Sequence, residues 1–214
     1  ILNNYCNYNV IFFSFSSRSS LANDCVYLLN FFPKNELSQL LLYLKEGAKV
    51  ALLYPENEYG YLINSYVDEV IFESPAILVN RSSYKDDLSN VRDSIKELGK
   101  YELRKYELNR QKQILSSKKD EKSKKRLKKL ERFKTTSDYD FTHILIADYG
   151  LNLLQVAPLL PYYDIDPNIV QFMGTGVIDD KTFFYEPSLQ GAIFPGIPQT
   201  RRINLINNYM EIYE

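Results

Sequence analysis

The chain has 214 residues, 45% of them hydrophobic, and a formal net charge of −1 at pH 7. This length is sufficient for one sizeable core or two small lobes, and the near-zero charge excludes a general electrostatic attraction to nucleic acids or membranes. No run of about 18 apolar residues occurs, so the sequence predicts no transmembrane helix.

The first part of the chain predicts a strand, a serine-rich loop and a helix. Residues 10–15 form an apolar run, which we interpret as a buried strand, and the loop 16–20 after it is rich in serine. Its hydroxyl groups either bind a small polar ligand or form a turn that caps the next segment. After a second apolar run at 26–32, leucines recur at i, i+3, i+4 and i+7 within residues 35–47, which predicts a core-facing helix.

The most informative stretch is Val50-Ala-Leu-Leu-Tyr-Pro-Glu-Asn-Glu-Tyr-Gly60. Its apolar half is long enough for a buried strand and too short for a capped helix. Apolar pairs then recur at helical spacing from Leu62 to Ile71. The unit is therefore a strand, a tight loop and a helix. In open α/β folds ligands bind at the loops that follow the strands, so the loop at 55–60 is either an ordinary connection or part of a binding site.

Residues 81–140 differ from the rest of the chain in charge. They contain 19 of the 26 Lys and Arg residues and 11 of the 27 acidic residues, a net charge of +8. The other residues carry 7 cations and 16 acids, a net charge of −9. Apolar residues at helical spacing, interrupted at Ser116-Ser117, predict a projecting hairpin of two charged helices. We interpret its basic residues 118–134 as a solvated face, or as a contact surface for nucleic acid, anionic lipid or an acidic partner.

The remaining chain alternates between strands and helices. We predict strands at 75–79, 141–147, 169–173 and 191–195, and helices from Leu151 and Arg202. Asp148-Tyr-Gly150 follows a strand as Tyr59 and Gly60 do, so the strand-end pattern occurs twice. The alternating order predicts an α/β fold with a mostly parallel, doubly wound sheet and helices on both faces.

Few residues favour catalysis or metal binding. His143 is the only histidine and lies in an apolar run, with no nucleophile placed beside it. Gly174-Thr-Gly176 lacks the lysine of a phosphate loop, and Cys6 and Cys25 fit no metal-binding spacing. The two cysteines form a disulfide or remain unpaired, and we favour the unpaired state. We expect no enzyme activity, no metal and no cofactor.

Several motifs resemble those of type I periplasmic binding proteins, the class that includes branched-chain amino acid binding proteins. The stretch from Val50 to Gly60 resembles the conserved turn of this class. Phe172-Met-Gly174 and Gly191-Ala-Ile-Phe are similar to its late strand and return crossover. Ala157-Pro-Leu-Leu-Pro-Tyr-Tyr-Asp164, after a long charged insertion, resembles the penicillin-binding protein activator branch more closely. The resemblance covers most of the chain.

The resemblance implies a type I periplasmic binding protein-like fold with two lobes, of which this chain is a part. It assigns residues 1–33 to the first lobe and residues 34–190 to the second, with the helical insertion at about 81–140. Residues 191–214 are the return into the first lobe. Since the chain begins with Ile1, we expect further sequence upstream.

In this class a small ligand lies between the lobes, and the resemblance implies five candidate contacts. Ser14 and Ser16 match the serine loop of the first lobe approximately. Tyr59 matches the tyrosine that closes over the ligand, and Tyr149 lies near a second aromatic position. Thr175 follows the late strand.

One departure from the class concerns charge. Members carry an acidic residue after the late strand, where it pairs with the amine of the ligand, but here the first carboxylate after that strand is Asp179. A buried ammonium group without a partner charge is costly. We therefore expect a free α-amino acid to be a poor ligand, which again favours the activator branch.

The resemblance implies a non-catalytic periplasmic protein that regulates peptidoglycan synthesis, as penicillin-binding protein activators do, by contacting a cell-wall synthase. The alternative is the substrate-binding component of an ABC transporter for a small polar ligand such as an amino acid or amide. Both functions place the protein in the periplasm, attached to a membrane only through an upstream lipidated segment. Neither involves nucleic acid.

Overall fold

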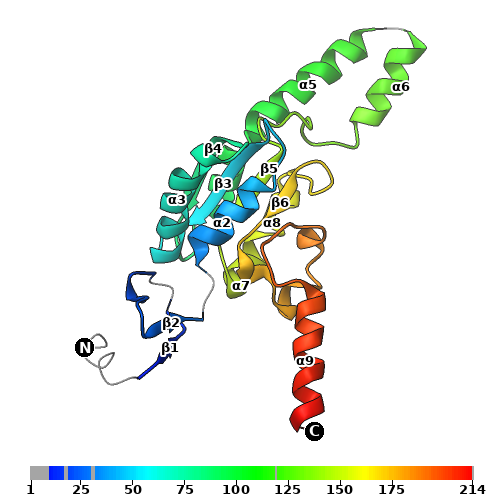
Figure 1. The fold of residues 1–214 in the computed structure, drawn as a ribbon. Coiled ribbons are helices and arrows are strands. Elements are labelled where there is room, and N and C mark those ends of the chain that lie inside the picture. The colour runs from blue at the N-terminus through cyan, green and yellow to red at the C-terminus, as the bar shows by residue number, and fades with distance from the viewer. Residues whose placement is uncertain (1–9, 17–18, 30–31, 119, 214) are drawn as a thin grey trace.

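The computed structural model describes residues 10–16, 19–29, 32–118 and 120–213. Within these residues the main sheet is built from β3 Lys49–Pro55, β4 Ile77–Tyr84, β5 His143–Ile146 and β6 Gln171–Met173. The strands lie in the order β4-β3-β5-β6, and each neighbouring pair is parallel (Figure 1). The predicted α/β class with a parallel sheet is therefore confirmed.

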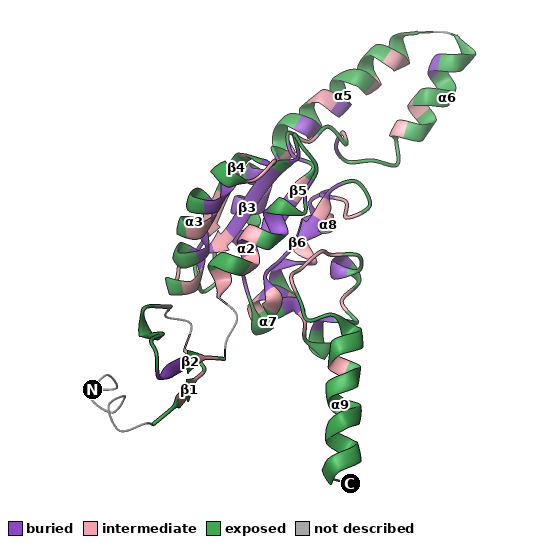
Figure 2. Cartoon of the chain, in the orientation of Figure 1, coloured by how far each residue is buried: buried purple, intermediate pink, exposed green. Residues whose placement is uncertain are grey.

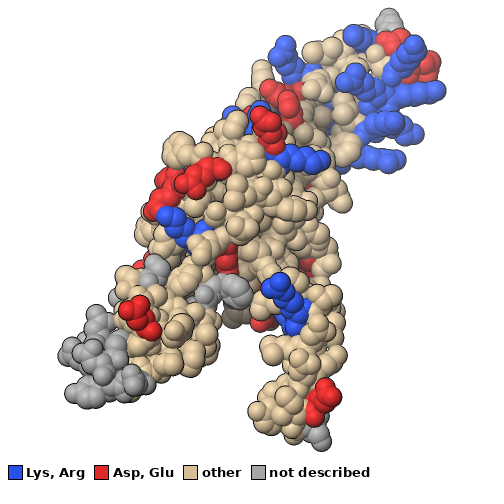
Figure 3. Space-filling model, in the orientation of Figure 1, with Lys and Arg blue, Asp and Glu red and all other residues tan. Residues whose placement is uncertain are grey.

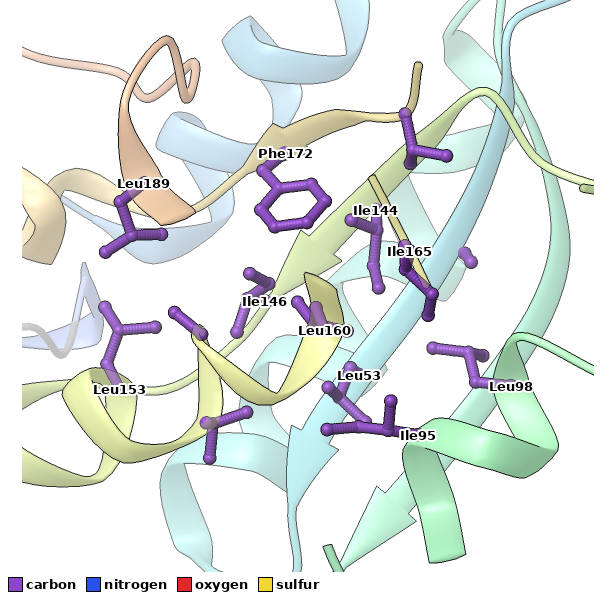
Figure 4. Packing of buried hydrophobic residues seen from close by; sticks show 14 of the residues in the cluster. Leu53, Ile95, Leu98, Ile144, Ile146, Leu153, Leu160, Ile165, Phe172 and Leu189 are labelled. Atoms are coloured by element: carbon purple, nitrogen blue, oxygen red, sulfur yellow. The ribbon is translucent and has the colours of Figure 1, made fainter. Parts of the chain in front are cut away.

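Helices cover both faces of this sheet. One face is covered by α2 Pro33–Leu42 and α3 Glu58–Val70, and the other by α4 Val91–Leu98, α7 Gly150–Val156 and α8 Leu159–Tyr162. Val50 and Leu52 of β3 join the core under α2 and α3, whereas Leu53 joins the opposite core (Figure 4). Side chains alternate between the faces of a strand, so the continuous apolar run in β3 reflects burial on both sides.

Two segments near the ends of the chain lie outside this body. β1 Phe12–Ser14 and β2 Val26–Leu28 form a separate parallel pair, and α9 Gln199–Tyr213 has no buried residue. Figures 1 and 2 show both segments extending from the same end of the body, with α9 almost entirely exposed. Cys25, just before β2, is disulfide-bonded, so the expectation of unpaired cysteines is wrong for this residue. Cys6 lies outside the described residues.

The charged segment forms the predicted helical hairpin. α5 Tyr101–Ser117 and α6 Glu121–Leu130 pack against each other and project from the body (Figure 1). The hairpin lies between α4 and β5 in the chain, so it leaves from the edge of the sheet at which β5 begins. None of the described helices has the length and apolar character needed to cross a membrane.

Three details differ from the sequence-based expectation. β4 continues to Tyr84 because its polar half pairs with β3 through the backbone and needs no apolar side chains. The strand expected at 191–195 is reduced to a single bridge between Met173 and Ile193. The charged segment contains an additional break before α5, where Lys100 has a left-handed φ of 48°. The other short elements are the 3-10 turns η2 Ser19–Leu21, η3 Ile71–Glu73, η4 Gly176–Ile178, η5 Lys181–Phe183 and η6 Pro187–Leu189.

A buried arginine attaches the hairpin to the body. Arg104, in the first turns of α5, is only 2% exposed. Its Nε donates to the Gly99 carbonyl at 2.7 Å, and its Nη2 donates to the Tyr163 carbonyl at 3.3 Å. Its Nη1 donates to Thr135 Oγ1 at 2.9 Å and to the Thr136 carbonyl at 2.8 Å. One side chain therefore joins the start of α5, the return segment after α6 and the loop after α8.

The positive charge of Arg104 is buried and offset by dipoles and an aromatic ring. Burial lowers the pKa of the Arg104 guanidinium, yet an arginine side chain stays protonated in proteins. Its central carbon lies 4.6 Å from the centre of the Tyr139 ring, within the range of a cation–π interaction. The acceptors described above satisfy its donors, which makes the buried charge tolerable.

Arg104→Ala is expected to lower the free energy of unfolding by about 2–4 kcal/mol, because it leaves several buried carbonyl groups without donors. Urea unfolding followed by circular dichroism measures this change. The matched control is Arg110→Ala, which removes an exposed arginine from the same helix and should change stability by less than about 0.5 kcal/mol. Equal midpoints for the two variants would show that the buried guanidinium does not hold the hairpin.

Candidate functional site

The carboxyl ends of three adjacent parallel strands lie at one edge of the main sheet. Tyr59 follows β3, Asp148 and Tyr149 follow β5, and Thr175 follows β6. The chain places β4 on one side of β3 and then adds β5 on the other side, so the strand order reverses between β3 and β5. Ligands bind in the crevice at such reversal points in open α/β folds. This edge is therefore the candidate site.

Three of the five residues singled out by the resemblance are in contact at this edge. The Tyr59 hydroxyl lies 2.6 Å from Thr175 Oγ1. The rings of Tyr59 and Tyr149 meet edge to face, with their centres 5.1 Å apart. Thr175 is buried, Tyr59 is half-buried and Tyr149 is exposed. Tyr59 is thus held between a buried hydroxyl group and an aromatic ring that faces solvent.

The local sequence fixes the position of Tyr59. Asn57 caps α3, because its Oδ1 accepts a hydrogen bond from the main-chain N–H of Gly60 at 2.9 Å. A Cβ atom on residue 60 would overlap the carbonyl oxygen of Pro55. Glycine therefore lets α3 begin directly against the end of β3, and Tyr59 lies in the first turn of that helix.

Two carboxylates beside the cluster were missed by the sequence-based reasoning. Glu36, in the first turn of α2, accepts a hydrogen bond from the main-chain N–H of Gly176 at 3.1 Å. Asp148 is buried and accepts from the Tyr84 hydroxyl at 2.5 Å and from the main-chain N–H of Tyr149 at 2.8 Å. Asp148 had a sequence signal, because it directly follows an apolar strand. Glu36 had none, because 140 positions separate it from Gly176.

The electrostatics of the site keep the hydroxyl groups of Tyr59 and Tyr84 neutral. Burial raises the pKa of Tyr59 to about 12, and the negative charges of Glu36 and Asp148 act in the same direction. Burial and the hydrogen bond to Asp148 also raise the pKa of Tyr84. Burial raises the pKa of Asp148, although the hydrogen bond from Tyr84 opposes this change. Neutral hydroxyl groups beside acidic groups suit a small polar ligand that carries donors or a positive charge.

The two predicted serines do not join this cluster. Ser14 and Ser16 lie in and just after β1, outside the main sheet (Figure 1), and Ser14 Oγ accepts from the main-chain N–H of Ser16 at 3.2 Å. His143 begins β5, so it lies at the opposite edge of the sheet from the cluster. Across the described ranges, no group of three or more His, Cys, Asp or Glu residues is arranged to hold a metal ion.

No protein-family model matches the chain, and a search of curated proteins finds no match. Solved structures do match. An ABC transporter substrate-binding protein from Desulfitobacterium hafniense aligns with 99% of this chain and 53% of its own, at 14% identity and a TM-score of 0.52. An ABC-type branched-chain amino acid transporter protein from Rhodopseudomonas palustris aligns with 80% of this chain and 38% of its own, at 10% identity and a TM-score of 0.51.

These likenesses establish the fold. The chain has the fold of periplasmic binding proteins of the type that includes ABC-transporter substrate-binding proteins. It spans 53% and 38% of the lengths of the two matched chains. The expected type I periplasmic binding protein-like architecture is therefore confirmed, while the closer resemblance to the activator branch stays a prediction.

Because the pKa of Tyr59 is raised, the free energy of unfolding should depend on pH in the alkaline range. The folded-state pKa, about 12, lies above the ordinary value of 10.0, so folding favours the neutral hydroxyl. The contribution of the neutral Tyr59 hydroxyl to the free energy of unfolding is complete below pH 10 and is lost as the pH rises toward 12. Between these values the unfolding free energy of the wild type should fall more steeply than that of Tyr59→Phe, by at most about 1.4 kcal/mol per pH unit.

Urea unfolding at a series of alkaline pH values measures the two slopes. The control is Tyr61→Phe, which removes the hydroxyl of an exposed tyrosine in the same helix and is expected to follow the wild type. Identical slopes for the wild type and Tyr59→Phe would contradict the burial of this hydroxyl.

Proposed function

We propose that the protein is a non-catalytic substrate-binding protein whose site for a small polar ligand lies at the carboxyl edge of the main sheet. The observation that carries this proposal is the convergence of Tyr59, Tyr149 and Thr175 from three separate elements, at the reversal of strand order. Glu36 and Asp148 lie beside them. Such a group of polar side chains around an aromatic pair is typical of a small-molecule site.

The chemistry of the edge favours ligands with an amine or amide group. The neutral hydroxyl groups of Tyr59 and Thr175 both donate and accept hydrogen bonds. The carboxylate of Glu36 supplies a hydrogen-bond acceptor and a negative charge. It comes from α2, whereas the sequence-based prediction looked for a carboxylate only after the late strand. The expectation that the ammonium group of an amino acid would lack a partner charge therefore no longer applies. Asp179 itself is engaged by the guanidinium of Arg202 in α9.

The domain boundaries remain part of this proposal. We assign residues 34–190 to one lobe, which holds the main sheet and the cluster, and residues 1–33 and 191–214 to the other lobe. Two observations support the assignment. β1 and β2 pair with each other instead of with the main sheet, and α9 has no buried residue in this chain. A ligand between the lobes would then be covered by residues near Ser14 and Ser16.

Regulation of peptidoglycan synthesis is the other function that the resemblance implies. It rests on the segment Ala157–Asp164 and on the charged insertion, and contact with a cell-wall synthase stays a prediction. The matched solved structures are described as transport proteins, so import of a small ligand is the function we favour. Both functions place the protein in the periplasm.

A thermal-shift screen of the full-length protein with amino acids, amides and short peptides tests the proposal. A ligand that binds only the folded state raises its stability by about 2.7 kcal/mol at 100 times its Kd. For the compound that binds, Thr175→Val and Tyr59→Phe should each weaken affinity by roughly 3–10-fold through the loss of one hydrogen bond. Glu36→Gln should weaken binding of amine-bearing compounds more than binding of neutral amides, because it removes only the charge.

Tyr61→Phe is the control, since this tyrosine is exposed in the same helix as Tyr59. It is expected to bind as the wild type does. A panel in which no compound raises the melting temperature, or a binding compound whose affinity none of the three site variants alters, would overturn the proposed site.

A further inference from the structure

The surface of the hairpin carries a concentrated positive charge that the candidate site does not use. Residues 118–134 contain ten Lys and Arg residues against three acidic ones, a net charge of +7 in a chain whose total is −1. Figure 3 shows basic side chains gathered over the hairpin, whereas the rest of this face carries few of them. A segregation of this size creates a strong local potential even when the whole protein is nearly neutral.

α6 separates its apolar side chains from its cations. The apolar residues Leu127 and Leu130 are half-buried, and the small polar residue Ser123, four positions before Leu127, is buried. These positions form one helix face, and α6 packs against α5. Because this face of α6 packs within the hairpin, the surface that α6 presents to solvent is mainly charged.

The exposed side of α6 carries a basic stripe formed by Lys122, Lys125, Arg126 and Lys129. Their i, i+3, i+4 and i+7 spacing places them along one face of the helix. Lys124 forms an ion pair with Glu121 in the same helix. Among the described residues, none of the four cations of the stripe forms an ion pair with a carboxylate. The stabilising effect of cations on a helix dipole is confined to the last turn. It accounts for Lys129, which lies in the last turn of α6, but not for the other three cations of the stripe.

We propose that the basic stripe binds the anionic headgroups of a phospholipid membrane surface. The complementarity is one of charge and shape, because four cations on one side of a projecting helix can meet a flat layer of phosphates together. Clusters of four to eight Lys and Arg residues on an amphipathic helix are typical of binding to anionic lipids. The hairpin leaves from the edge of the sheet at which β5 begins, so this contact leaves the candidate ligand site at the opposite edge free.

Nucleic acid is the less suitable anionic partner. Binding of single strands combines a basic groove with aromatic side chains on which bases stack, and Glu121–Leu130 contains no aromatic residue. The stripe also consists of exposed side chains that all come from a single helix. Binding to a DNA duplex through its phosphates alone needs no aromatic residues, and it is measured separately in the experiment below.

Co-sedimentation of the full-length protein with lipid vesicles tests the proposal. The protein should sediment with vesicles of phosphatidylcholine and phosphatidylglycerol but not with vesicles of phosphatidylcholine alone, and salt should release it. Each cation near an anionic surface strengthens binding about fivefold. The quadruple variant K122Q/K125Q/R126Q/K129Q should therefore bind more than about 100-fold more weakly. Glutamine is a good helix former, and circular dichroism checks that the fold is kept.

The matched control is K45Q/K85Q/R92Q/K181Q, which removes three exposed lysines and one exposed arginine outside the hairpin. It should keep most of the binding, because the charge removed is the same but lies elsewhere. Absence of binding by the wild type, or an equal loss in both quadruple variants, would overturn the proposal. Fluorescence anisotropy with a labelled DNA duplex provides the other arm: stripe-dependent binding to the duplex without binding to vesicles would assign the stripe to nucleic acid instead.

Discussion

The parallel pairing of β3, β5 and β6 is the constraint on which the candidate site depends. The register joins Leu53 of β3 to Ile146 of β5, and Leu145 of β5 to Met173 of β6, so the three strands end side by side. Parallel strands need crossover connections, which carry the chain back before each new strand begins. Residues separated by more than a hundred positions, such as Tyr59 and Thr175, therefore meet at one edge. An antiparallel arrangement would send alternate strand ends to opposite edges.

The same constraint explains why a long insertion is tolerated. The hairpin connects α4 to β5 at the edge where the strand begins, and the cluster lies at the edge where the strand ends. Loops at the amino ends of the strands can grow without reaching the ligand side. A rigid attachment is still needed, because a projecting hairpin has little contact area with the body. Arg104 supplies it through hydrogen bonds to three separate segments.

The sequence predicted the fold well because its main signals are local. The apolar run of β3, the leucine spacing of α2 and the Pro-Glu-Asn break before α3 each depend on residues close together in the chain. Signals failed where long-range contacts decide the structure. The polar half of β4 is a strand only because β3 lies beside it, and no periodicity in its own residues indicates this. The break between α4 and α5 was missed although Gly99 ends α4, because the apolar spacing continues across it and the left-handed residue itself is Lys100.

The candidate site divides in the same way. Tyr59, Tyr149 and Thr175 were singled out by the resemblance, and each lies shortly after a strand of the main sheet. Glu36 follows no strand of the main sheet, and it reaches the site through a hydrogen bond to the main chain of Gly176. A Cβ atom on residue 176 would lie 2.6 Å from Glu36 Oε1, so the absence of a side chain there permits the approach. The negative charge of Glu36 is thus placed at the site by its contact with Gly176, and only the folded chain brings these two residues together.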